Sequence, residues 1–224
     1  LDGIETELAL VNEARDRPAG KIRISASDHA IHELLLPKLS QFMQDYPDVC
    51  VEMITDYGLI DIISERYDAG VRYGETLAKD MIAVRIGPDA RMVAVGSPDY
   101  FDRFGRPESP SDLQSHNCIG LRQTSGRLYA WELQREGEDE IKVQVSGQLI
   151  FNNSYSCLSA ALAGLGLAFI PQDLAEAHLQ AGRLEIVLGE WSLPFPGFYL
   201  YYPTVTQPSQ AFSLLVEALR YRWP

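Results

Sequence analysis

Residues 21–46 read KIRISASDHAIHELLLPKLSQFMQDY, and this stretch decides the fold. Its first four residues alternate charged and β-branched side chains, which predicts a strand. The short polar residues Ser25-Ala26-Ser27-Asp28 are typical of a helix start. From Ile31 onward, apolar residues recur at steps of three and four, which predicts a helix with one apolar face. Because Pro37 lies inside that pattern, we expect it to kink or split the helix.

The junction between this strand and helix predicts half of a small-molecule site. A strand that runs directly into a helix leaves backbone N–H groups without partners at the helix start. In open α/β sheets, ligands bind at this edge. A second polar helix start, Asn152-Asn153-Ser154, comes much later in the chain. It predicts a helix cap, and a ligand contact there remains an open alternative.

The remaining pattern alternates strands with helices, which favours parallel pairing with helices on both faces of a sheet. The acidic turn at residues 136–139 predicts a β-hairpin. The final strand and helix have no obvious partners in the second half, so we expect them to complete the first sheet. The chain would then cross between two lobes near Gly96 and again at residues 194–197. Further strands are expected at residues 49–55, 69–73, 81–86, 91–95, 118–121, 167–170, 184–188 and 198–202, and helices at 59–66 and 211–221.

Length, net charge and cysteine content exclude several classes of function. The 224 residues can bury one large core or two modest ones. The formal net charge of −12 argues against binding of DNA phosphates by this segment. The three cysteines, Cys50, Cys118 and Cys157, form no CxxC pair, so we expect reduced thiols in a cytoplasmic protein. No apolar run approaches the roughly 20 residues of a membrane span, and the first residues do not resemble a signal peptide.

No motif indicates catalysis, a cofactor or a metal. His29, His32 and Glu33 do not have the order of HExxH or HxxEH. The Gly-Leu-Gly at residues 164–166 joins a helix to a strand, opposite to a dinucleotide loop. Arg72 and Arg122 each come near the end of a predicted strand. Either could meet an anionic ligand or form a surface salt bridge, and the sequence leaves both open.

Several segments in order resemble a known family. They are GKIRISAS (residues 20–27), LLPKLSQFMQDYPDVCVEM (35–53), IDIISERYDAGVRYGE (60–75), VSGQLIFNNSYSCLSAALAGLGLAFIPQDL (145–174), GRLEIVL (182–188) and FYLYYP (198–203). Residues 20–222 resemble the effector-binding domain of LysR-type transcriptional regulators, in the CrgA-like branch.

The resemblance implies an α/β fold of two Rossmann-like lobes of the periplasmic-binding-protein type II, joined by two crossover strands. We expect residues 18–95 and 197–224 to form the first lobe, residues 96–196 the second, and residues 1–17 the end of a linker helix. The family also implies a small-molecule effector, a homodimer that pairs as a tetramer, and DNA binding through an N-terminal winged helix-turn-helix absent from this chain. A membrane partner, a cofactor and enzymatic activity are not expected.

The resemblance further places ligand contacts at the first strand-to-helix turn and at four other points of the cleft. Asp28 departs from the apolar or aromatic residue often found near that turn, and its carboxylate would oppose an anionic ligand. Our hypothesis is an effector that bridges the helix starts at Ser27 and Asn153. The alternative is a free-standing periplasmic-type solute-binding protein. The implied contacts are Ser25, Ala26, Ser27, Asp28, Arg72, Arg122, Thr124, Ser125, Asn152, Asn153, Tyr201 and Thr204.

Overall fold

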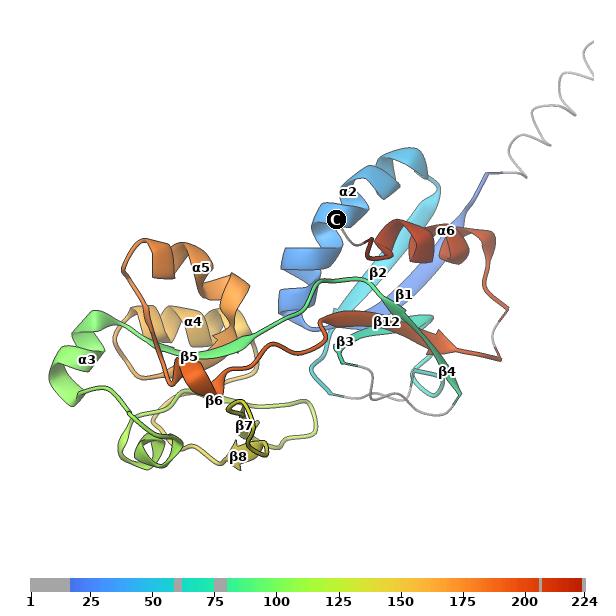
Figure 1. Cartoon of the computed structure of the whole chain (residues 1–224). Helices are drawn as coiled ribbons and strands as arrows, with labels where there is room; N and C mark the ends of the chain where they lie inside the picture. The colour runs from blue at the N-terminus through green and yellow to red at the C-terminus, as the bar shows by residue number, and fades with distance from the viewer. Residues whose placement is uncertain (1–16, 59–61, 75–79, 206, 223–224) are drawn as a thin grey trace, which may run out of the picture.

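The computed structural model describes residues 17–58, 62–74, 80–205 and 207–222. Figure 1 shows two α/β lobes joined by two segments of chain that run alongside each other. The expected linker helix at residues 1–16 lies outside the described residues, as do residues 59–61 of the expected helix at 59–66. The described remainder of that stretch, residues 62–66, forms turns.

A five-stranded sheet forms the first lobe. β1 (Gly20–Ala26) lies between β2 (Val49–Thr55) and β3 (Ala69–Tyr73) and is parallel to both. β12 (Phe198–Pro203) then inserts between β3 and β4 (Met81–Arg85), antiparallel to each. The prediction that the final strand completes the first sheet is confirmed, and the sheet order is β2-β1-β3-β12-β4.

One long helix and the last helix cover this sheet (Figure 1). Residues 28–45 are helical throughout, with a π-helical turn η1 (Ala30–Leu35) followed by α2 (Leu36–Asp45). Pro37, which lacks an N–H, follows directly after this widened turn, and the helix continues through it, so the expected split is not found. α2 packs against α6 (Gln210–Leu219).

The apolar face of the long helix supplies the core of the first lobe. Leu35, Leu39 and Phe42 are at most 3% exposed and pack with the sheet and α6. Burying each such side chain contributes about 1.5–3 kcal/mol. The Lys38 ammonium donates to the backbone carbonyls of Ile86 and Leu219, both at 2.7 Å. These contacts hold the middle of the long helix against the sheet and α6.

The second lobe is built around β5 (Met92–Gly96), which pairs antiparallel with β10 (Ala168–Pro171) on one side and β11 (Glu185–Val187) on the other. Short strands β6 (Gly120–Leu121) and β9 (Ile150–Phe151) pair in parallel. The predicted hairpin is present as β7 (Trp131–Leu133) and β8 (Ile141–Val143). The helices of this lobe are α3 (Pro98–Phe104), η2 (Pro110–Ser115), α4 (Ser154–Leu162), α5 (Gln172–Gln180) and η3 (Gly189–Trp191).

The first crossover lies before β5, so the boundary expected at residues 95 and 96 is wrong. Val93, Ala94 and Val95 are fully buried between β10 and β11 in the second sheet. A continuous apolar run shows that a strand is central, but it does not show which sheet contains the strand. The chain instead leaves the first lobe after β4 and enters the second at β5.

The two crossover segments pair with each other. Ala90 and Phe195 exchange backbone hydrogen bonds of 2.9 Å in both directions. Two residues further on, Gly197 lies against the Pro88 carbonyl, and a Cβ on Gly197 would fall 1.7 Å from that oxygen. A glycine is therefore required at residue 197 for the segments to approach this closely.

Candidate functional site

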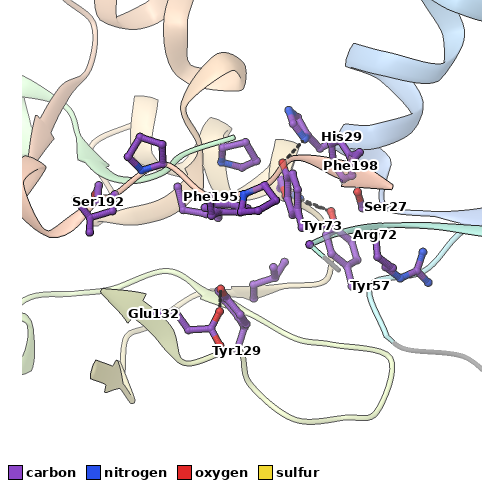
Figure 2. A pocket seen from close by; sticks show the side chains of 18 of the residues that line it. Ser27, His29, Tyr57, Arg72, Tyr73, Tyr129, Glu132, Ser192, Phe195 and Phe198 are labelled. Carbon is purple, nitrogen blue, oxygen red and sulfur yellow. Dashed lines mark hydrogen bonds between the residues drawn. The ribbon is translucent and has the colours of Figure 1, made fainter. Parts of the chain in front are cut away.

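A cavity of about 560 Å³ lies between the lobes beside the crossover segments (Figure 2). The first lobe contributes Ser27, Tyr57 and Arg72 to its wall, and the second contributes Tyr129 and Glu132. Residues 191–196, from the end of η3 into the second crossover, complete it. This volume is in the range of small-molecule sites, which are commonly concave and placed between domains.

Aromatic rings make up one wall of this cavity. Tyr73 and Phe198 stack with ring centroids 3.9 Å apart, and Phe195 packs its edge on Tyr73 at 5.2 Å. The Tyr73 hydroxyl lies 2.9 Å from Nδ1 of His29. Burial, followed by the nearby charge of Asp173, raises the pKa of Tyr73. The hydroxyl therefore stays protonated and can donate to His29.

Arg72 lines the cavity, but most of its hydrogen-bonding capacity is used by the protein. Its guanidinium donates to the Gly58 carbonyl at 2.8 Å, the Val71 carbonyl at 2.7 Å, and the carbonyl and hydroxyl of Ser25 at 3.0 and 2.9 Å. An oxygen of the Asp56 carboxylate lies 4.0 Å away. Burial lowers the pKa of Arg72. Arg72 thus ties β1 and β3 to the loop after β2 and is partly neutralised in place.

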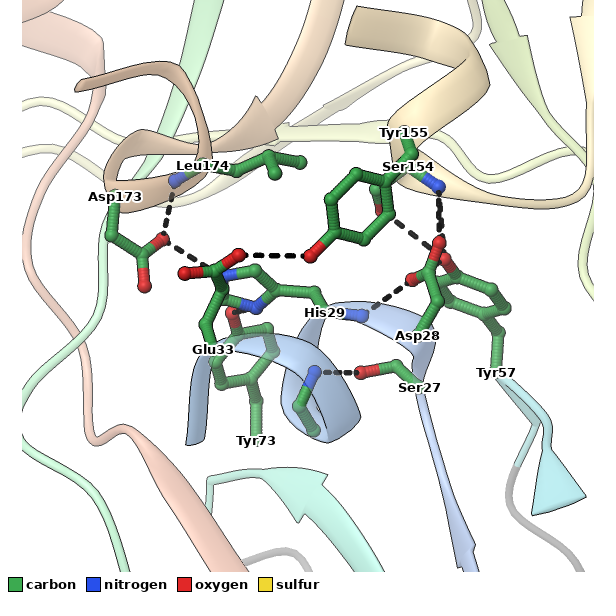
Figure 3. Close-up of polar contacts among 11 residues, drawn as sticks. Ser27, Asp28, His29, Glu33, Tyr57, Tyr73, Ser154, Tyr155, Asp173 and Leu174 are labelled. Carbon is green, nitrogen blue, oxygen red and sulfur yellow. Dashed lines mark hydrogen bonds and ion pairs between the residues drawn. The ribbon is translucent and has the colours of Figure 1, made fainter. Parts of the chain in front are cut away.

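The start of α4 is occupied by a side chain from the opposite lobe (Figure 3). The Ser154 backbone N–H donates to the Asp28 carboxylate at 3.0 Å, and the Tyr57 hydroxyl donates to the same carboxylate. The backbone N–H of His29 adds a third donor at 2.6 Å. Asp28 therefore places a negative charge where the positive end of the α4 dipole attracts one.

Other direct contacts join the two lobes around this point. His29 Nε2 lies 2.9 Å from Oδ1 of Asp173 in α5, and the Tyr155 hydroxyl donates to Glu33 at 2.9 Å (Figure 3). The Thr124 hydroxyl donates to Asp56 at 2.7 Å. The lobes are thus held together by their own side chains, with the cavity beside these contacts.

Comparison with known proteins identifies the family of the chain. A family model described as the LysR substrate binding domain matches residues 15–224. The chain belongs to this family. Its members among curated proteins include a Pseudomonas aeruginosa PAO1 protein named as a transcriptional regulator, 51% identical over 225 residues that span all of this chain and 73% of that protein. The HTH-type transcriptional regulator PgrR of Escherichia coli K12 is 42% identical over 99% of this chain and 74% of its own length.

Solved LysR-type structures share the fold. CrgA of Neisseria meningitidis aligns with a TM-score of 0.73 at 24% identity, covering 96% of this chain and 73% of that one. Full-length AphB of Vibrio cholerae aligns with a TM-score of 0.76 at 23% identity, covering 97% and 75%. The resemblance and the mixed α/β fold of two lobes are confirmed. The chain is an effector-sensing regulatory domain of the LysR type, and the relatives do not support a free-standing solute-binding protein.

Ser27 and Arg72 of the expected contacts line the cavity of this LysR domain. Ser25 and Ala26 are fully buried in β1, where Ser25 accepts from Arg72. The Tyr201 hydroxyl is buried in β12 and has no hydrogen-bond partner among the described residues. Asp28 binds the start of α4. An effector that bridged the helix starts at Ser27 and Asn153 would have to displace Asp28, which already binds the start of α4.

The expected contacts from the second lobe lie outside the cavity wall. Asn153 caps α4 by accepting from the Ser156 N–H at 2.7 Å, and Asn152 before it is exposed. Arg122 donates to the Gly126 carbonyl at 2.7 Å within its own turn, and Ser125 is exposed in that turn. Thr204 of the first lobe donates to the Asp80 carbonyl at 3.1 Å.

Sequence reasoning missed most of the wall. The one signal in the sequence is the cluster of aromatic residues and prolines near the second crossover, and the pattern there predicts only a connection between lobes. The missed wall residues include Tyr57, Tyr73, Tyr129, Glu132, Trp191, Phe195 and Phe198.

The described residues of this LysR domain include no group of three or more His, Cys, Asp and Glu that could hold a metal ion. His32 instead packs its ring against Tyr155, 5.2 Å away. No helix in the described ranges has the length and apolar content of a membrane span.

Proposed function

We propose that the cavity between the lobes is the effector site, with Ser27 and Arg72 on its wall, and that its occupancy sets the relative position of the lobes. The observation that carries this proposal is a single cavity formed by both lobes and the crossover next to them. A ligand there contacts every part that must move in a hinge motion. It shifts the equilibrium only by its differential affinity for the two positions.

The direct contacts between lobes define what the ligand acts on. Asp28 with Ser154, His29 with Asp173 and Glu33 with Tyr155 all break when the lobes separate. A ligand that fits the cavity of the closed arrangement stabilises these contacts, and one that needs more room opposes them. Through a homodimer or tetramer, either change alters the spacing of DNA-reading helices elsewhere in the regulator.

The same proposal includes binding without turnover and action in the cytoplasm, where the DNA is. The relatives are named as regulators of transcription, not as enzymes. A ligand recovered chemically unchanged after long incubation with the protein supports this part, and a product would contradict it.

A thermal-shift screen of amines, carboxylates and uncharged metabolites against this chain tests the site. A ligand at about 100 times its Kd adds about 2.7 kcal/mol of stability. Gln123→Trp fills the cavity, because Gln123 lies on its wall. Gln148→Trp is the matched control, because Gln148 is an exposed glutamine of the same lobe.

We expect each hit to lose its stabilising effect in Gln123→Trp and to keep it in Gln148→Trp. Hits that stabilise both variants equally would place the site elsewhere. A screen without a hit that depends on Gln123 would overturn the proposed function.

A further inference from the structure

Two features near the cavity that could attract an anion, the start of α4 and Arg72, are already used by the protein's own groups. Asp28 binds the start of α4, and the Arg72 guanidinium donates to acceptors on Ser25, Gly58 and Val71, with Asp56 close by. A carboxylate ligand would have to displace these short intramolecular contacts. If a ligand bound the start of α4 instead, the buried Asp28 carboxylate would lose the Ser154 N–H as a donor, which is costly.

The opposite end of the cavity carries an excess of negative charge. Glu132 and Glu140 line it, and Lys142 is the ammonium nearest both, at 2.6 Å from Glu132 and 3.4 Å from Glu140. Two carboxylates thus share one ammonium, whose side chain is 61% exposed and lies outside the wall. One negative charge at this end remains uncompensated by Lys142.

The neighbouring tyrosine contacts one of these carboxylates. The Tyr129 hydroxyl donates to Glu132 at 2.8 Å (Figure 2). Burial, followed by the charge of Glu132, raises the pKa of Tyr129. The hydroxyl remains a donor, and Tyr129 lines the cavity.

The aromatic surface suits a cation and an apolar body together. Ring faces attract ammonium and guanidinium groups, more strongly when water is excluded. Trp191 on the wall already has the Arg135 guanidinium over its ring at 4.8 Å. Leu121, Pro194 and Phe195 supply apolar contact for the rest of a ligand.

Resting on the proposed function, we propose that the effector carries a positively charged nitrogen on an apolar or aromatic body. The nitrogen lies at the Glu132 and Glu140 end, and the body lies along Tyr73, Phe195 and Trp191.

Three probes with the same ring and similar length test this proposal: tyramine, 2-(4-hydroxyphenyl)ethanol and 4-hydroxyphenylacetate, which end in an ammonium, a hydroxyl and a carboxylate. Calorimetric titration at neutral pH measures their affinities for the chain. We expect tyramine to bind about tenfold more tightly than the alcohol, and the carboxylate to bind most weakly.

Glu132→Gln keeps the acceptor for Tyr129 but removes the charge, so it should bring tyramine to within about threefold of the alcohol. Glu136→Gln is the control, an exposed glutamate in the turn of the same hairpin, and should leave the preference unchanged.

Equal affinity of the three probes, tightest binding of the carboxylate, or no binding of tyramine would each overturn the proposed ligand class. The proposed function fails by a different result, namely the absence of any ligand whose binding depends on Gln123. The two failures are therefore distinguishable.

Discussion

Asp28 holds the two lobes together with one carboxylate. It accepts from the Ser154 N–H of the second lobe, from the Tyr57 hydroxyl and from the His29 N–H. Asp28→Ala removes the acceptor that these donors share at the lobe contact, and the Ser154 N–H keeps only the Tyr57 hydroxyl, at 2.9 Å. We expect it to lower the free energy of unfolding by about 1–3 kcal/mol, measured by urea denaturation.

Asp102→Ala is the control for this substitution, because Asp102 is exposed on α3. It should change the free energy of unfolding by less than about 0.5 kcal/mol. If both variants were equally stable, the contact between Asp28 and α4 would contribute nothing to stability.

Sequence reasoning noticed Asp28 as unusual at its position but could not find its partner. Ser154 lies 126 residues further along the chain. Local pattern identifies a helix start and its own cap, such as Asn153, but not a cap supplied by another lobe. The same holds for Arg72. The sequence indicated that it lies near a strand end, but not which acceptors its guanidinium binds.

At the scale of elements, the crossover segments depend on one glycine. Gly197→Ala would place a Cβ 1.7 Å from the Pro88 carbonyl oxygen, so the paired segments must separate. We expect a loss of stability of about 1–3 kcal/mol in urea denaturation and weaker binding in the adjacent cavity.

Gly189→Ala is the matched control, since its nearest neighbour for a new Cβ is Ile186 Cγ2 at an ordinary 3.7 Å. The pairing of the crossovers would be irrelevant to stability if both glycine variants unfolded at the same urea concentration.

The strands and helices themselves were largely predictable. β1 with its long helix, the hairpin of β7 and β8, and the strand β12 follow from periodicity and turn residues. Which sheet contains β5 was not predictable, because the apolar residues Val93–Val95 suit a central strand in the sheet of either lobe. The aromatic wall was missed for a related reason: whether Phe195 and Phe198 face the cavity depends on strand register.

At the scale of the whole molecule, closure of the lobes should depend on pH. Burial raises the pKa of Asp173, but the hydrogen bond and charge of His29 outweigh it, so the pKa lies below its ordinary value of 3.8. A carboxyl whose folded pKa is lowered contributes stability above its unfolded pKa and loses it as the pH falls through the lower folded value.

The free energy of unfolding of the wild type should therefore exceed that of Asp173→Asn at about pH 5, and the difference should shrink as the pH falls below the ordinary value of 3.8. Urea denaturation across this range measures it. Glu176→Gln, on the same helix α5, should show no such trend against the wild type. A difference independent of pH would contradict the role of the Asp173 charge.

The position of β12 has a consequence for biosynthesis. Among the strands of the described residues, β12 alone joins β4 to the rest of the first sheet, yet the whole second lobe precedes it in the chain. As the polypeptide emerges from the ribosome, β5, β10 and β11 are all available before β12 is made. Domains fold as units as their residues become available. The second lobe can thus fold first. The part of the first lobe made earlier completes its sheet only when β12 has been synthesised.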